Sequence, residues 1–237
     1  MRIFIINPNT SEAMTDQIRA SLNGIRRQDT ELFVTCAATG PETIESAYDE
    51  AYAVPPTLDL VKRANTEGYD AVIIACFSDP GLQAAREISA IPVFGIQETS
   101  IHVAAMLGAG FAVMTPRAYR VNSKRLEVLH KRMGEHLVCV LALDMTTAET
   151  TADPAKTKAR AIALGREALA RGAEVAVLGC AGMSGYADAV EAETGIRVLD
   201  PTAVTLKVAE GLVELGVRHS KVGLYTTPPQ KPFKGKR

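Results

Sequence analysis

The chain contains 237 residues, of which 47% are hydrophobic and 22% charged, and its formal net charge is -1. This composition is ordinary for a globular protein and excludes disordered, collagen-like and coiled-coil chains. The balance of 26 basic against 27 acidic side chains provides no global positive field for a nucleic acid or an anionic membrane, so we expect a small-molecule partner.

Short apolar runs alternate with longer stretches of helical period along the chain. The apolar runs predict strands at 2–6, 31–37, 70–75, 91–95, 110–114, 136–143, 174–179 and 196–199. This alternation is typical of an α/β fold with parallel strands. Eight strands are too many for one minimal flavodoxin-like sheet, which favours more than one sheet.

The spacing of apolar residues predicts helices at 10–25 and 156–171. Asn9 followed by Glu12 resembles a capping pair for the first of these helices. Asp79-Pro80 predicts the cap and first turn of a helix at 80–89. In the segment 48–66, Pro55-Pro56 predicts a kink or a late helix start.

The two halves of the chain resemble one another. YDAVIIACFSDPG places Cys76 just after a predicted strand, and AEVAVLGCAGMSG does the same for Cys180, with 180 − 76 = 104. Pro8 and Pro116, which also follow strands, give 116 − 8 = 108. The sequence therefore predicts two similar halves of four strands each.

Ligands of open parallel sheets bind outside the carboxyl ends of the strands. Two halves that face each other would therefore share one cleft, with Cys76 and Cys180 on opposite sides of it. The alternative interpretation is that these are small buried residues, a common fate of free cysteine. We prefer that interpretation for Cys36 and Cys139, which lie inside strand runs.

Two opposed thiols predict a racemase. Helix N-termini lower thiol pKa values, so one thiolate and one neutral thiol could coexist near neutral pH. The thiolate would remove a proton from one face of a carbon atom, and the thiol would deliver a proton to the other face. Asn9, Thr10 and Thr115 could supply neutral hydrogen bonds to the substrate, or could simply cap their turns.

Three motifs carry a family resemblance: INPNTS at 6–11, IACFSDPG at 74–81 and VLGCAGMS at 177–184. Together they resemble the hydantoin racemase branch of the aspartate/glutamate racemase superfamily, over the chain to about residue 222. The resemblance implies two similar flavodoxin-like domains related by pseudo-twofold symmetry, each with a four-stranded parallel sheet. It also implies a cofactor-independent enzyme whose catalytic residues match Cys76 and Cys180.

The resemblance further implies how the chain divides into domains and what lines the substrate site. It assigns 1–97 plus 206–237 to the first domain and 98–205 to the second. It also implies a homo-oligomer. The expected lining residues are Asn9, Ser78, Thr115, Ala181 and Gly182.

One departure from the amino-acid racemases bears on the substrate. Those enzymes typically have Thr-His after the second cysteine, whereas Ala181-Gly182 stands here. An uncharged site favours a 5-monosubstituted hydantoin over a charged amino acid. Phe77, Ile44 and Tyr48 could form an apolar pocket for the 5-substituent, or could be ordinary packing residues.

Other functions stay open at this point. Allantoin is itself a substituted hydantoin and could use the same sulfurs. Arylmalonate decarboxylases keep only the second cysteine, and the dianionic substrate of maleate isomerases calls for more cationic groups than these motifs display. A non-catalytic two-lobed binder and a Cys-His hydrolase are weaker alternatives.

Cofactors and membranes have little support in the sequence. The four cysteines show no CxxC or CxxH spacing, and GxGxxG, Walker A and HExxH patterns do not occur, so we expect no metal or other cofactor. The apolar start IFII ends at Asn7-Pro8, too short for a signal peptide or a membrane span. These features predict a cytoplasmic protein with free thiols.

Overall fold

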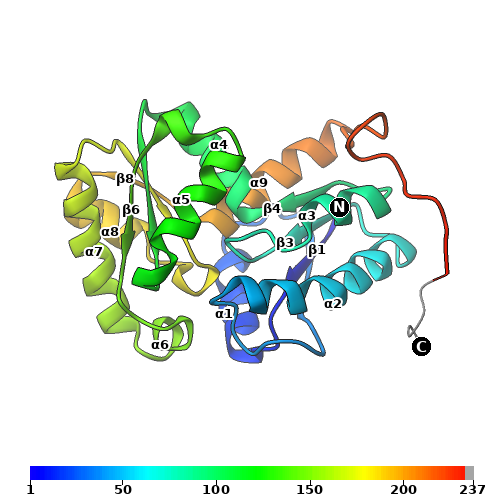
Figure 1. Ribbon diagram of the computed structural model, residues 1–237, viewed down its shortest axis with the longest axis horizontal. Coiled ribbons are helices and arrows are strands. Elements are labelled where there is room, and N and C mark those ends of the chain that lie inside the picture. The colour runs from blue at the N-terminus through cyan, green and yellow to red at the C-terminus, as the bar shows by residue number, and fades with distance from the viewer. Residues whose placement is uncertain (233–237) are drawn as a thin grey trace.

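The computed structural model describes residues 1–232, which form two halves, each built on a four-stranded parallel sheet (Figure 1). The sheets have the strand orders β2-β1-β3-β4 and β6-β5-β7-β8. Their strands are β1 (Arg2–Asn7), β2 (Glu31–Cys36), β3 (Ala71–Ile74), β4 (Val93–Gly95), β5 (Phe111–Thr115), β6 (Leu137–Ala142), β7 (Val175–Leu178) and β8 (Arg197–Leu199). The shared order confirms the predicted duplication and the α/β class.

Helices cover the faces of both sheets. They are α1 (Glu12–Asn23), α2 (Ala47–Thr66), α3 (Leu82–Ile88), α4 (Ile96–Leu107), α5 (Val121–His130), α6 (Thr147–Ala152), α7 (Pro154–Ala170), α8 (Ala187–Thr194) and α9 (Pro201–Glu214). Within residues 1–232, none of these helices combines the length and the apolar character needed to cross a membrane.

The two halves share a hydrophobic core at their junction, where Figure 1 shows α4 and α9. One cluster of buried side chains includes Ile5 and Phe94 from the first sheet, Phe111 and Val177 from the second, and Leu206 from α9. The central strands β1, β3, β5 and β7 are buried along almost their whole length, as expected for parallel strands covered on both faces. The continuous core fixes the halves against each other.

Helix α9 packs on α1, β3 and β4 of the first half and on α4. This packing supports the proposal that the end of the chain completes the first domain. A boundary at Pro201, where α9 begins, would keep that helix whole, whereas a boundary at 206 would cut it. The part of the first-domain assignment that covers residues 233–237, including Lys234, Lys236 and Arg237, lies outside the described residues.

Two helix starts differ from the sequence prediction because polar side chains cap other groups. The cap of α1 is Ser11, whose hydroxyl accepts from the Met14 N–H, while Asn9 accepts from the Ser11 N–H. The cap of α3 is Gly81, at φ 73°, so the predicted start at residue 80 is wrong. The carboxylate of Asp79 instead accepts from two backbone N–H groups at the start of α4.

Helix α2 starts early despite its two prolines. Ser46 and Asp49 form a capping box that sets the start at Ala47, and the helix continues through Pro55 and Pro56. The predicted late start is therefore wrong. Proline removes a helical N–H donor, but the remaining backbone bonds and the buried face of α2 maintain the helix.

We expect Gly95→Ala to destabilise the fold. A Cβ at Gly95 would lie 2.4 Å from the carboxylate of Asp79, which is only 5% exposed and bound to two backbone N–H groups. Such overpacking lowers the free energy of unfolding by about 1–3 kcal/mol. The control is Gly211→Ala in α9, where a Cβ meets nothing within 4 Å. There the higher helix propensity of alanine should raise the free energy of unfolding by about 0.5–1 kcal/mol. Urea unfolding followed by circular dichroism measures both changes, and equal midpoints for the two variants would contradict this packing.

Candidate active site

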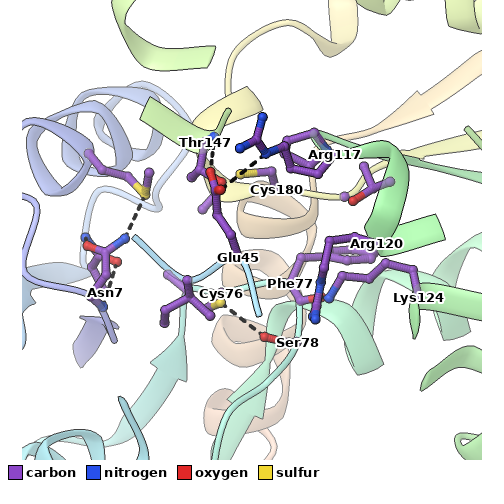
Figure 2. A pocket seen from close by; sticks show the side chains of 18 residues that line it. Asn7, Glu45, Cys76, Phe77, Ser78, Arg117, Arg120, Lys124, Thr147 and Cys180 are labelled. Carbon is purple, nitrogen blue, oxygen red and sulfur yellow. Dashed lines mark hydrogen bonds and ion pairs between the residues drawn. The ribbon is translucent and has the colours of Figure 1, made fainter. Parts of the chain in front are cut away.

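The carboxyl ends of strands from both halves meet at one pocket. This is the edge at which open parallel sheets bind ligands. Figure 2 shows the thiols of Cys76 and Cys180 in this pocket, with Asn7 on one side and Arg120 and Lys124 on the other. The two cysteines come from equivalent turns, one in each half.

The turn that carries Cys76 is fixed by backbone bonds. Strand β3 ends at Ile74, and the Ala75 N–H donates to the Ile6 carbonyl at 2.8 Å. The Asp79 N–H then closes the turn by donating to the Cys76 carbonyl at 2.9 Å. The Cys76 sulfur lies 3.4 Å from the hydroxyl oxygen of Ser78.

The turn that carries Cys180 depends on a close backbone approach. The Gly179 N–H donates to the Met114 carbonyl, and a Cβ at Gly179 would lie 2.4 Å from that oxygen, so only glycine fits here. The Cys180 sulfur accepts from the Gly182 N–H at 3.4 Å. The Gly182 carbonyl accepts from Gln17 of the first half at 3.0 Å, which ties this turn across the junction.

The surroundings of both sulfurs disfavour a thiolate. Burial within the protein raises the pKa of the Cys180 thiol to about 12 and also raises the pKa of Cys76, although each residue keeps part of its surface open to the pocket. The charge of an ionised Cys76 would raise the pKa of Cys180 further, whereas Lys124 lowers the pKa of both thiols. Two ionised thiols are therefore strongly disfavoured.

The expectation that helix N-termini lower these pKa values is wrong. Only a three-residue 3-10 helix, Ala181–Met183, follows Cys180, and α3 does not begin until Leu82. The local stabilising contacts of the sulfurs are instead the Ser78 hydroxyl and the Gly182 N–H.

The structure brings most of the predicted site residues together and leaves three outside the lining. Tyr48 is 71% exposed and packs its ring on Tyr52, while Gly182 donates its N–H to the Cys180 sulfur without lining the pocket. The Thr10 N–H donates to the Pro41 carbonyl, so Thr10 holds the loop before α2 in place. The predicted residues that line the pocket are Cys76, Cys180, Asn9, Ile44, Phe77, Ser78, Thr115 and Ala181.

The expectation of an uncharged site is wrong. Glu45, Arg117, Arg120 and Lys124 also line the pocket. The carboxylate of Glu45 accepts from the Thr147 N–H at 2.6 Å and from Arg117 at 3.3 Å, which joins the two halves at this pocket.

The other two cations are paired as well. Arg120 pairs with Glu50 and with Glu127, and Lys124 pairs with Glu127 at 2.8 Å. Among residues 1–232, each of the three cations that line the pocket is thus matched by a carboxylate.

The repeat contained a sequence signal for Arg117. The offset of 108 that relates Pro116 to Pro8 also relates Arg117 to Asn9, so Arg117 occupies the position in the second half that Asn9, a predicted lining residue, occupies in the first. Glu45 lies in an irregular loop and Lys124 on the helix after the turn, and neither position carries a local sequence motif. Sequence reasoning therefore had no comparable signal for these two.

The other two cysteines lie away from the pocket lining. Cys36 is in β2 and Cys139 in β6, the edge strands of their sheets, and both are partly exposed rather than buried as expected. The Cys36 thiol donates to Glu12 at 3.2 Å. They serve as internal controls for the pocket cysteines.

Comparisons with known proteins agree on one family. The sequence model of the family described as Asp/Glu/Hydantoin racemase matches residues 3–209. The chain is 38% identical to a hydantoin racemase of Pseudomonas sp. strain NS671, over 99% of this chain and 95% of that one. It is 36% identical to a hydantoin racemase of Rhizobium meliloti, over 99% and 98%. A solved allantoin racemase from Klebsiella pneumoniae superposes with a TM-score of 0.96 at 32% identity, covering 100% of this chain and 97% of that one.

We expect alkylation of Cys76 and Cys180 by iodoacetamide to accelerate about tenfold per pH unit between about pH 7 and 9. Only the thiolate reacts, and because both pKa values are raised, the thiolate fraction still grows with pH throughout this range. Peptide mass mapping separates these sites from Cys36 and Cys139. A rate that stays flat above neutral pH would show a thiol already ionised and would contradict the effect of burial.

Proposed function

The chain belongs to the Asp/Glu/hydantoin racemase family and is a racemase, and we propose that it inverts C5 of 5-monosubstituted hydantoins by a two-base mechanism without a cofactor. The observation that carries this proposal is the presence of Cys76 and Cys180 in one pocket, one from each half. Two thiols that approach one substrate carbon from opposite faces are suited to invert its configuration.

In the proposed reaction, a thiolate at one cysteine takes the C5 proton, which forms an S–H bond and breaks the C5–H bond. The electron pair of that bond moves onto the neighbouring carbonyl of the ring as an enolate. The opposite thiol then gives its proton to the other face of C5 and becomes a thiolate. One proton is taken and one delivered, and the exchanged protonation states suit the reverse reaction.

Neutral hydrogen-bonding groups are proposed to stabilise the enolate. Ser78 and Thr115 bring hydroxyls to the pocket, one from each half. Asn9 is oriented by Asn7, whose side-chain N–H donates to the side-chain oxygen Oδ1 of Asn9 at 2.6 Å. The side-chain N–H of Asn9 faces the sulfur of Met14, a weak acceptor, so a substrate carbonyl would be a stronger partner.

The paired charges support a neutral substrate over a dianionic one. Each cation of the lining is matched by a carboxylate, so the pocket offers little net positive charge to a dicarboxylate such as maleate. A hydantoin ring, with carbonyl acceptors and N–H donors, can bond to such groups without upsetting their charge balance.

Allantoin is a second candidate substrate, and a specific observation favours it. Arg117 and Glu45 place donors and acceptors in the lining, which would suit the ureido group at C5 of allantoin. Met14, Ile44 and Phe77 provide apolar lining, which would suit a hydrocarbon substituent. Whether allantoin or a hydantoin with a hydrocarbon substituent is preferred depends on whether the 5-substituent contacts the polar or the apolar part of the lining.

We expect Cys76→Ser and Cys180→Ser each to slow racemisation of a 5-substituted hydantoin at least about 100-fold, because a serine hydroxyl is a far weaker acid than a thiol and therefore supplies almost no anionic base near neutral pH. Polarimetry measures the rate, and circular dichroism checks the fold. The matched controls, Cys36→Ser and Cys139→Ser, should keep their rates within about twofold, since these residues lie outside the pocket lining. More than a few per cent of turnover in both pocket variants would refute the two-base scheme.

We expect proton NMR in heavy water to show faster loss of the C5 hydrogen from 5-benzylhydantoin than from allantoin, if the apolar lining receives the substituent. The double variant Cys76→Ser/Cys180→Ser supplies the background exchange. A rate at least about tenfold higher for allantoin would assign the substituent to the Arg117 and Glu45 lining instead. Background rates for both compounds would contradict hydantoin racemisation altogether.

A further inference from the structure

The proposed mechanism needs a thiolate in a pocket whose burial favours the neutral thiol. A compensating positive charge is present on α5 of the second half, where Lys124 is only 5% exposed. A buried ammonium is normally found with specific partners. The partners of Lys124 bear directly on the two thiols.

We propose that Lys124 is a positioning residue of the reaction: its ammonium holds the turn that carries Cys76 and supplies the positive charge that allows one of the two thiols to ionise. This inference rests on the proposed function, because it concerns how the two-thiol reaction obtains its base.

The contacts of Lys124 support the positioning part of this proposal. Its ammonium donates to the carbonyl of Phe77, the residue after Cys76, at 2.7 Å, and lies 5.9 Å from the centre of the Phe77 ring. Lys124 belongs to the second half and Phe77 to the first, so the bond joins the two halves beside the pocket, where Figure 2 shows the two residues next to each other. The position of Cys76 therefore depends on a residue that is distant in sequence.

The charges around the pocket support the electrostatic part. Lys124 is the positively charged group that lowers the pKa of both Cys76 and Cys180, whereas Glu50 raises the first and Glu45 the second. A cation near a thiol favours the thiolate. The charged groups that line the pocket or pair with its cations are Glu45, Glu50, Arg117, Arg120, Lys124 and Glu127.

Glu127 is the carboxylate that weakens the electrostatic effect of Lys124 on the two thiols. Its carboxylate accepts from Lys124 at 2.8 Å, from Arg120 at 3.3 Å and from Gln97 at 2.6 Å. The negative charge of Glu127 offsets part of the field of Lys124 at the sulfurs. Removal of either charge should therefore move thiol ionisation, and the two shifts should have opposite signs.

The test is the rate of alkylation of Cys76 and Cys180 by iodoacetamide in the full chain, measured between about pH 7 and 9, where the rate follows the thiolate fraction. Lys124→Met should slow alkylation about tenfold at each pH, because a nearby cation is lost. Glu127→Gln should accelerate it, because the counter-charge of Lys124 is lost while Lys124 remains. Lys124→Arg keeps the charge and should leave the rate within about twofold of that of the unsubstituted chain.

A matched control exists on α9. Lys207 pairs with Glu210 at 2.8 Å with the same three-residue spacing, and neither residue lines the pocket. Lys207→Met and Glu210→Gln change the net charge of the protein by the same amounts as the test variants. They should leave the alkylation rate unchanged.

The outcomes separate this inference from the proposed function. A slower rate for Lys124→Met with a faster rate for Glu127→Gln supports it, and unchanged rates, or changes in the same direction, overturn it even if the protein racemises hydantoins. If Lys124→Met fails to fold, Glu127→Gln and Lys124→Arg still decide the question, because an unchanged rate for Glu127→Gln overturns the inference. Failure of the proposed function would appear separately, as no exchange of the C5 hydrogen in the unsubstituted chain.

Discussion

Repulsion between like charges in a pocket enclosed by protein limits the two central thiols to one negative charge at a time. Burial raises the pKa of both, and ionisation of Cys76 would raise that of Cys180 further. A doubly ionised pair is therefore disfavoured, and when one member ionises the other keeps its proton. The proposed inversion at carbon needs that state, with a base on one side and an acid on the other. The rest of the site can be understood as the means of holding this pair and supplying its single charge.

The duplicated fold brings the pair together, and the differences between its halves give each thiol its own surroundings. Both sheets have the same strand order, so the turns after β3 and β7 reach one pocket. Cys76 lies beside a hydroxyl and Cys180 beside a backbone N–H. A shared core around α4 and α9 keeps the halves in register, and Lys124 links them at the pocket itself.

Local pattern was sufficient to predict the strands, the repeat and the turns that carry Cys76 and Cys180, because strand periodicity and residue offsets are properties of the sequence. It failed where a side chain has several possible partners. Asp79 was expected to cap the helix that follows it, yet it binds the start of α4, which is distant in sequence. The charges of Glu45 and Lys124 enter the pocket from a loop and a helix with no motif, so only the fold brings them there. Tyr48 was a candidate for the apolar pocket or for ordinary packing, but it faces solvent.

The most direct test of the two-thiol account follows the C5 hydrogen in each enantiomer separately. The reaction is started in heavy water from one enantiomer of a 5-substituted hydantoin and stopped within the first few per cent of conversion, before reversal matters. The account predicts that the product enantiomer carries deuterium at C5, because its proton comes from the opposite, solvent-exchanged thiol, while the recovered substrate keeps its original hydrogen. Product that retains the original hydrogen, or recovered substrate labelled as fast as product, would show one base acting on both faces and would contradict the account.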